Sequence, residues 1–289
     1  MASPLYTMRA LANPGPGYVT WQYGYPDYAG THAPSAILAG TAVVVSGEVP
    51  LGGLGKLDTT HSPVGLWLFS ANLNDSSGNG FNLTGTPRGY TYPVEDVLYG
   101  AIFENAAWTK TTEASLIITG AVTVQVFGVF QLDGVNSQYL VSFGSNGELS
   151  ANNRLYDFRI GSDLSLGMFW ENGSGSNNSI SGTAAMVPIG IPAHLVATRS
   201  GAANPVVNFY VNGVSAGGGV VANAASGGGS ASSFLSIGDN SEAPGALSIT
   251  RPGTLFYCVK ITPSELTESQ VKAEYNRVLG GRGIVYPRL

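Results

Sequence analysis

Carboxylates are the residues in this sequence that could hydrolyse a glycosidic bond, but their spacing does not suit that reaction. Glycoside hydrolysis needs two carboxyl groups aimed at one bond, and on a strand only alternate residues share a face. Glu95 and Asp96 are adjacent, so they would face opposite sides of a strand. Glu265, Glu268 and Glu274 belong to a predicted C-terminal helix and its approach, where solvated charges are usual. We therefore expect no glycosidase activity.

The sequence also lacks the motifs of nucleophilic hydrolases and of nucleotide-binding proteins. The sequence has no G-x-S-x-G segment that would expose a serine nucleophile. It also has no phosphate-binding glycine-rich run followed by Lys and Ser or Thr. His32 and His61 lie in or beside the N-terminal segment, and His194 begins a predicted strand, where hydrogen bonding is the usual role. The sequence therefore predicts a protein that is not an enzyme.

One segment has the spacing of the start of a calcium-binding loop. Its residues are Asp75, Ser77, Asn79 and Gly80. The twelfth position of such a loop is Thr86 here, instead of the glutamate that would bind calcium with both oxygens. The same residues also form an ordinary Asx-type turn between two strands. Asp75 and Asn79 are therefore candidate metal ligands, but we favour the turn and expect no cofactor.

Two tryptophans are candidates for binding a glycan. Binding sites combine aromatic surfaces with a few polar groups, and they occur in loops carried by a rigid scaffold. Trp108 and Trp170 both lie beside polar loops. The alternative, which we favour, is that both cap the core or contact a neighbouring subunit, because aromatic side chains bury so much area. Trp67 lies inside an apolar run and is predicted to be a core residue.

The composition favours many short strands and argues against several partners. The 289 residues include 40 glycines, which suit tight turns between strands, and only 11% charged residues. With a net charge of −5 and 13 Lys and Arg residues, no nucleic acid is expected as partner. We expect no membrane partner, since no apolar run reaches the roughly 18 residues that span a bilayer. No signal-peptide pattern begins the sequence, so cytoplasmic synthesis is expected.

Residues 1–60 differ in composition from the rest of the chain. They hold few charges, several prolines and a cluster of aromatic residues: Tyr18, Trp21, Tyr23, Tyr25 and Tyr28. Disordered tails are usually charged and poor in aromatics, so this segment is not a solvated tail. We interpret it as an extended arm, with one candidate strand at residues 36–45, whose aromatic cluster anchors it on a partner. Residues 61–289 are then the folded domain.

Beyond the arm, apolar residues recur at every second position in runs bounded by Gly, Asn and Ser, which is typical of a sandwich or barrel. The clearest alternation covers residues 122–132. Other candidate strands lie at residues 64–69, 115–118, 139–143, 155–160, 166–170, 194–199, 206–211, 234–237 and 255–261. Residues 173–182 and 217–233 are expected to form loops. Thr267 and Gln270 form a capping box, which predicts a short helix near the C-terminus.

Several of these segments resemble the laminin-G-like, concanavalin A-like lectin and glucanase family. Residues 64–86, VGLWLFSANLNDSSGNGFNLTGT, are similar to the first strand, the D-x-SG-N-G turn and the second strand of that family. Its late strands and closing helix resemble four later segments: AHLVATRS, VVNFYVNGV, LSIGD and GTLFYCVKITPSELTESQVKAEYN. The resemblance covers roughly residues 62–280 and implies an all-β jelly roll of two stacked antiparallel sheets. It implies no particular activity, because one fold can carry many functions.

The combination of a jelly roll with a charge-poor aromatic arm is similar in construction to tailed-phage virion surface proteins. That resemblance implies a non-enzymatic capsid decoration, or cement, protein on the virion surface. Residues 1–60 would bind the major capsid protein or other virion subunits, and the jelly roll would point outward. By analogy we expect a homo-oligomer, with a trimer as the first expectation. Two alternatives stay open: a glycan-binding receptor-recognition domain of a phage fibre or tail, and a secreted lectin.

Overall fold

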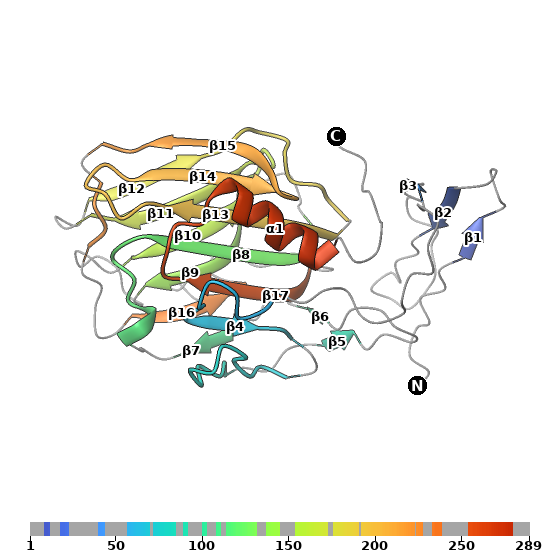
Figure 1. Ribbon diagram of the computed structural model, residues 1–289, viewed down its shortest axis with the longest axis horizontal. Coiled ribbons are helices and arrows are strands. Elements are labelled where there is room, and N and C mark those ends of the chain that lie inside the picture. The colour runs from blue at the N-terminus through green and yellow to red at the C-terminus, as the bar shows by residue number, and fades with distance from the viewer. Residues whose placement is uncertain are drawn as a thin grey trace.

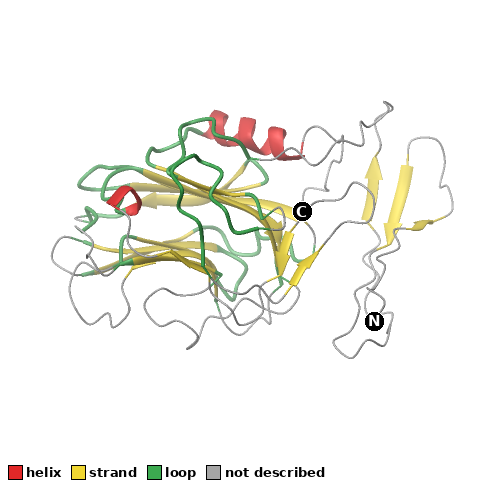
Figure 2. Cartoon of the chain, turned by 90° about the horizontal axis from the view of Figure 1, so that it is seen from below, coloured by secondary structure: helices red, strands yellow, loops and turns green. Residues whose placement is uncertain are grey.

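The fold is known from a computed structural model, in which two antiparallel sheets are stacked face to face (Figures 1 and 2). Side chains are described for residues 57–69, 72–84, 114–131, 137–144, 154–172, 176–190, 192–222, 224–227, 233–238 and 254–278. Six further strands are described by their backbone, at residues 9–11, 18–22, 40–43, 89–91, 100–102 and 108–110. The prediction of an all-β, two-sheet sandwich with one short C-terminal helix is confirmed.

The larger sheet has eight strands, and long-range pairing sets its register. Its strands are β4 (Gly65–Trp67), β5 (Gly89–Thr91), β6 (Gly100–Ile102), β8 (Val122–Val129), β13 (Pro192–Arg199), β14 (Val206–Val211), β15 (Val214–Val220) and β17 (Leu255–Thr262). They run in the order β15–β14–β13–β8–β17–β6–β5, and β4 pairs with β17 beside this path. At the centre, Val126 of β8 lies between Leu195 of β13 and Val259 of β17. The alternate apolar residues of β8 therefore face the partner sheet.

The smaller sheet has six strands, and it carries most of the polar residues discussed below. Its strands are β7 (Trp108–Lys110), β9 (Gln138–Gly144), β10 (Tyr156–Ile160), β11 (Leu166–Glu171), β12 (Asn177–Ser181) and β16 (Phe234–Ile237). They run in the order β12–β11–β10–β9–β16–β7, so β12 ends the sheet on one side. Each pairing is antiparallel, as expected for strands joined by turns and long connections.

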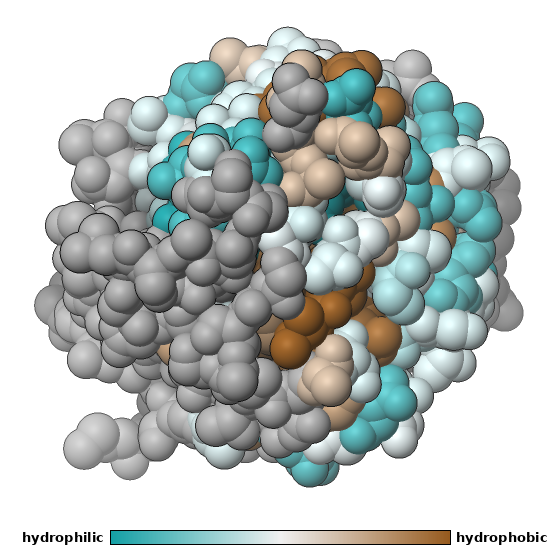
Figure 3. Space-filling view, turned by 90° about the vertical axis from the view of Figure 1, so that its left-hand side faces the viewer, coloured by the Kyte–Doolittle hydropathy of each residue, from teal (hydrophilic) through white to brown (hydrophobic). Residues whose placement is uncertain are grey.

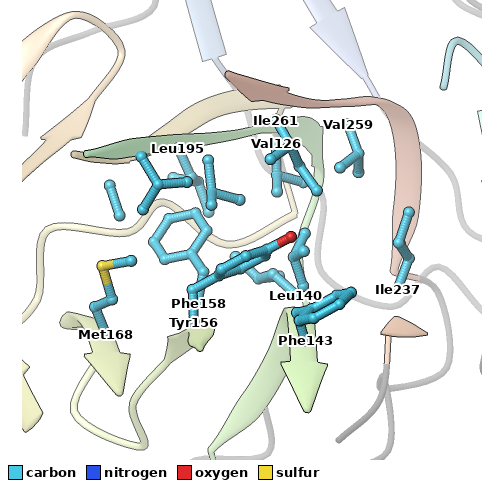
Figure 4. Packing of buried hydrophobic residues seen from close by; sticks show 14 of the residues in the cluster. Val126, Leu140, Phe143, Tyr156, Phe158, Met168, Leu195, Ile237, Val259 and Ile261 are labelled. Carbon is cyan, nitrogen blue, oxygen red and sulfur yellow. The ribbon is translucent and has the colours of Figure 1, made fainter. Parts of the chain in front are cut away.

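The hydrophobic core lies between the inner faces of the two sheets. In Figure 4, the larger sheet contributes Val126, Leu195, Val259 and Ile261, and the smaller sheet contributes Leu140, Phe143, Tyr156, Phe158, Met168 and Ile237. Burying each such side chain contributes about 1.5–3 kcal/mol, which makes this layer the main source of stability. Trp67 is fully buried and donates its indole N–H to the Phe81 carbonyl at 2.9 Å, which confirms its predicted core position.

A single α-helix among the described residues, α1 (Glu268–Leu279), covers the outer face of the larger sheet (Figure 2). The predicted capping box begins it: the Thr267 N–H donates to the Gln270 side chain at 2.8 Å, and the Gln270 N–H donates to the Thr267 hydroxyl at 3.3 Å. Val271 is buried beside Val196 of the sheet, and Val278 is buried on the same side of the helix. The helix is thus held by its apolar face.

Three local predictions were wrong. Residues 115–118 do not form a strand, because the chain there closes a local i to i+3 hydrogen bond in the short 3-10 helix η1 (Ala114–Leu116). The predicted loops at residues 173–182 and 217–233 contain β12 and the end of β15. Both strands are polar or glycine-rich strands at sheet ends, where one neighbour supplies the backbone hydrogen bonds and no alternating apolar pattern is needed.

Within residues 1–60, three short strands form an antiparallel sheet of their own. They are β1 (Arg9–Leu11), β2 (Tyr18–Gln22) and β3 (Gly40–Val43), in that order. The candidate strand at residues 36–45 is confirmed by β3, and the pairing of β1 with β2 shows that the arm is not merely extended chain. Tyr18 and Trp21 lie in β2, whereas three members of the aromatic cluster lie outside the described residues: Tyr23, Tyr25 and Tyr28. Anchoring by this cluster and the domain boundary at residue 60 stay predictions.

Among the described residues visible at one end of the sandwich, hydrophilic and intermediate residues surround a group of hydrophobic ones near the middle of the view (Figure 3). In the part of the chain with described side chains, the exposed large hydrophobic residues are Val214 and Val220. Single exposed apolar residues of this kind are normal on a protein surface. The helices of the described residues include none that is long and apolar enough to cross a bilayer.

Candidate functional site

The candidate calcium-loop residues form a turn in which both oxygens of the Asp75 carboxylate accept hydrogen bonds. Oδ1 accepts from the backbone N–H groups of Leu66 at 3.0 Å and Ser77 at 2.9 Å. Oδ2 accepts from the Ser77 hydroxyl at 2.7 Å and the Phe81 N–H at 3.1 Å. Asn79 donates its side-chain amide to a backbone carbonyl at 3.0 Å. The Asx-type turn is confirmed, and the expectation that no metal is bound stays a prediction.

Of the two candidate glycan-binding tryptophans, the structure describes the side chain of Trp170 and only the backbone of Trp108. Trp170 is fully buried, donates its indole N–H to the Ala224 carbonyl at 2.6 Å, and lies 5.5 Å below the Arg199 guanidinium. A buried ring offers no face to a sugar, which corrects the glycan-binding prediction for Trp170 in favour of its core alternative. Trp108 begins β7, where its backbone pairs with Ile237. The Trp108 side chain lies outside the described residues, so its role stays a prediction.

A buried charged network lies between α1 and the larger sheet. Lys260 Nζ and Glu274 Oε1 are 3.1 Å apart with neither side chain exposed, and Arg277 lies 3.0 Å from the same oxygen. This corrects the prediction that Glu274 is solvated: it occupies the sheet-facing side of the helix, opposite a lysine. His194 is buried nearby, 3.0 Å from Gln125 Oε1. Burial, followed by the charge of Lys260, lowers the pKa of His194 to about 3, so it stays neutral.

Another set of polar side chains lies on the outer face of the smaller sheet, the layer away from α1 in Figure 2. Alternate residues of β10 are buried in the core, so Asp157 and Arg159 point outward. The same alternation in β11 turns Phe169 and Glu171 outward, with Phe169 opposite Asp157. Tyr139 of β9 lies opposite Arg159. We call the following residues the outer-face cluster: Tyr139, Arg154, Asp157, Arg159, Phe169 and Glu171.

One half of the outer-face cluster is a charge network around Asp157, which is fully buried. Arg154 Nε lies 3.1 Å from Asp157 Oδ2, and the Ser142 hydroxyl donates to Oδ1. The Arg154 backbone N–H also donates to Glu171 Oε2 at 3.4 Å. Burial raises the pKa of Asp157 to about 6, while Arg154 and the Ser142 hydroxyl limit that rise. Asp157 therefore changes its charge much closer to neutral pH than an ordinary aspartate does.

The other half of the outer-face cluster is an arginine held against aromatic rings. Arg159 Cζ lies 3.5 Å from the ring centroid of Phe169 and 6.0 Å from that of Tyr139. The arginine runs across Gly167, where a Cβ would come within 3.4 Å of its Cγ and Nε. Burial lowers the pKa of Arg159 and raises that of Tyr139. All three side chains are half-buried, so this half of the cluster reaches solvent.

The outer-face cluster is not among the sites predicted from sequence, although part of its signal is there. Asp157 and Arg159 are charged residues at alternate positions of a strand that is otherwise apolar. A glucanase-type pair of carboxylates would lie within one strand, whereas Glu171 lies on the strand next to that of Asp157. Strand pairing also brings Phe169 and Tyr139 to Arg159, and no local pattern specifies that pairing.

Comparison with known proteins gives a family and a set of similar folds. A laminin G-type family model, described as the concanavalin A-like lectin/glucanases superfamily, matches residues 103–272. No curated protein sequence matches. The binding domain of botulinum neurotoxin serotype D/C VPI 5993 aligns with a TM-score of 0.55 and 13% identity, over 75% of this chain and 52% of that chain. This chain therefore spans about half the length of that toxin domain.

Two further structures share the fold. Domain 4 of AbnA, a GH43 extracellular arabinanase from Geobacillus stearothermophilus, aligns with a TM-score of 0.53 and 19% identity, over 74% of this chain and 98% of that chain. The binding domain of Paraclostridial Mosquitocidal Protein 1 aligns with a TM-score of 0.52 and 13% identity, over 73% and 51%. Such identities show the fold alone, whereas the family model covers more than half of the sequence. The chain belongs to the concanavalin A-like lectin/glucanase superfamily, as a laminin G-type domain.

Proposed function

We propose that this protein is a lectin-like binding domain that recognises carbohydrate through the outer-face cluster. The observation that carries the proposal is the half-exposed group of Tyr139, Arg159 and Phe169 on one face of the smaller sheet. Aromatic surface combined with a few placed polar groups is the usual make-up of a small-molecule site. A sheet face also holds these groups more rigidly than a loop would.

The last strand of the smaller sheet supplies further hydrogen-bonding groups beside this cluster. Asn177 and Ser179 of β12 are exposed, and they pair with Glu171 and Phe169 of β11. Their amide and hydroxyl groups can both donate and accept hydrogen bonds, as sugar hydroxyls do. An aromatic and cationic centre bordered by such groups is suited to a sugar ring with its surrounding hydroxyls.

Two of the similar structures support a carbohydrate as the ligand class. The arabinanase domain was solved in complex with arabinotriose. Cell entry of botulinum neurotoxin type C is dependent upon interaction with two ganglioside molecules. These are properties of those proteins, which are 19% and 12% identical to this chain, and they bear on the present protein only as support for testing glycans first.

A glycan array followed by calorimetry tests the proposal. Phe169→Ala removes the ring beneath Arg159, and we expect it to weaken binding of the best array glycan by about tenfold, a loss of roughly 1.4 kcal/mol. The control is Lys272→Ala, an exposed position on α1 at the opposite side of the sandwich. Both variants must unfold like the wild type. If no glycan binds, or if both variants bind equally well, the outer-face cluster is not a carbohydrate site.

We further propose that binding occurs without hydrolysis. The two carboxylates of the cluster, Asp157 and Glu171, both interact with Arg154, one through its side chain and one through its backbone N–H. A hydrolase would need one of them free as a nucleophile or base. Incubating the bound oligosaccharide with the protein and measuring new reducing ends tests this. Release of new reducing ends that depends on Asp157 or Glu171 would contradict it.

As a second candidate, we propose that residues 1–60 attach the domain to a virion as a decoration or fibre component. The supporting observation is that β1, β2 and β3 form a sheet separate from the sandwich, in a segment rich in aromatic residues. Deleting residues 1–55 should abolish assembly onto capsids and leave the sandwich folded. Full decoration of particles by the truncated protein would refute the anchoring role. Sedimentation of the full chain tests the expected homotrimer.

A further inference from the structure

Arg159 differs from the other arginines whose side chains are described. Arg154 and Arg277 pair with carboxylates, and Arg199 donates to three backbone carbonyls. Arg159 lies against the Phe169 and Tyr139 rings, and no described carboxylate lies within ion-pair distance of it. Its guanidinium is thus partly removed from water without a full set of oxygen partners, which is a costly state for a cation.

We propose that the Arg159 guanidinium is a carboxylate subsite, so that the glycan bound by the outer-face cluster is an acidic one carrying a carboxylated sugar. This inference rests on the proposed carbohydrate binding and names the ligand class of the same site. A sugar carboxylate would complete the hydrogen bonding of the guanidinium, and an opposite charge would offset its desolvation.

The orientation of the arginine suits a planar anion. Contact with the Phe169 ring and passage across Gly167 restrict the rotamers of Arg159, so the guanidinium is held in place before a ligand arrives. A guanidinium presents parallel N–H groups along one edge, which match the two oxygens of a carboxylate. A neutral sugar hydroxyl cannot use that pair of donors in the same way. The site therefore favours a carboxylated sugar over the corresponding neutral one.

The charges around Arg159 give the site a pH dependence. Asp157, two residues earlier in the same strand, and Glu171 repel a bound carboxylate when ionised, and Arg154 partly offsets both. The Tyr139 hydroxyl stays neutral, because burial raises its pKa. Protonation of Asp157, whose pKa burial raises to about 6, removes one negative charge from the cluster. Affinity for an acidic glycan should therefore increase as the pH falls from 7.5 to 5.5, and affinity for a neutral glycan should not.

Matched oligosaccharides test the subsite directly. The probes are oligogalacturonates and the same oligomers with their carboxyl groups methyl-esterified, together with sialyllactose and lactose. We expect the full-length wild type to bind at least one acidic probe about tenfold more tightly than its neutral counterpart. Arg159→Gln keeps hydrogen-bonding capacity but removes the charge, and it should abolish the preference. Arg159→Lys should keep only part of it, and Lys272→Gln on α1 should keep all of it.

The outcomes separate this inference from the proposed function. Equal binding of acidic and neutral probes, unchanged in Arg159→Gln, would overturn the carboxylate subsite and leave carbohydrate binding intact. Failure to bind any array glycan would overturn both. Acidic preference that survives in Arg159→Gln would also overturn the subsite, because the discriminating group would then lie elsewhere. For Asp157→Asn, the acidic preference should become independent of pH between 5.5 and 7.5, and a wild-type pH dependence that persists would refute the role of this carboxyl group.

Discussion

Replacing Asp157 by asparagine removes a buried carboxyl group whose ionisation opposes folding. Burial raises the pKa of Asp157 from 3.8 to about 6, so the folded protein holds this proton more tightly than the unfolded chain does. The resulting stability is fully present below pH 3.8 and is lost as the pH rises through about 6. This separation of roughly two pKa units corresponds to about 3 kcal/mol. Since Asp157 is fully buried, solvent screening does not reduce this figure.

Urea unfolding at several pH values, followed by tryptophan fluorescence, measures the effect. We expect the free energy of unfolding of the wild type minus that of Asp157→Asn to rise by about 2 kcal/mol between pH 7 and pH 4. The subtraction cancels the other carboxyl groups, which titrate in both proteins. Ser142→Ala removes the hydroxyl that donates to the carboxylate, so it should enlarge the pH effect. A wild-type minus variant difference that does not change with pH would refute the reasoning.

Three further substitutions test the packing of the larger sheet and of α1, each by urea unfolding. Glu274→Gln should lower the free energy of unfolding by about 3 kcal/mol, because it leaves the buried Lys260 charge without its carboxylate partner. Arg199→Met should lower it by about 3 kcal/mol, because three backbone carbonyls, two of them in buried hydrogen bonds, lose their donor. Gly128→Ala should lower it by about 2 kcal/mol, because the new Cβ would collide with the Leu255 carbonyl oxygen.

Matched controls accompany these three substitutions. Lys272→Gln changes a charge on the exposed side of α1 and should leave stability within about 0.5 kcal/mol of the wild type. Gly120→Ala adds a Cβ where no atom lies within 4 Å, so it should also be tolerated. An effect of Glu274→Gln no larger than that of Lys272→Gln would show that the helix does not bury this pair. Equal effects at Gly120 and Gly128 would contradict the close strand approach.

Much of the fold follows from local patterns in the sequence. The alternation of apolar residues in β8 predicts a strand, and the capping box at Thr267 predicts the start of a helix. Both patterns are local, because each involves residues only a few positions apart in the sequence. The strands β12 and β15 were not predicted, because they lack alternating apolar residues. A strand at the edge of a sheet depends more on backbone hydrogen bonds to its neighbour than on apolar side chains. The burial of Glu274 was not predicted for a related reason. Its ion-pair partner Lys260 lies on a different element, and helix periodicity indicates only which side of the helix faces inward.

The candidate site depends on pairing that local patterns leave open. The sequence shows charged residues at positions 157 and 159 of an apolar strand, which indicates an outward face. It does not show that Phe169 and Tyr139 lie beside Arg159, since a shift of one residue in register would turn either ring to the core. The buried state of Trp170 likewise follows from the stacking of the two sheets, although the residue borders a polar loop.

Acidic carbohydrate is proposed to bind to the outer face of the smaller sheet. The most direct measurement is a titration of 15N-labelled protein with an oligogalacturonate at pH 5.5, followed by amide chemical shifts. We predict that the largest changes fall in β9, β10, β11 and β12, centred on Arg159, and that those of α1 stay unchanged. Changes confined to α1 and the larger sheet, or shifts that an esterified oligomer reproduces in full, would contradict the claim.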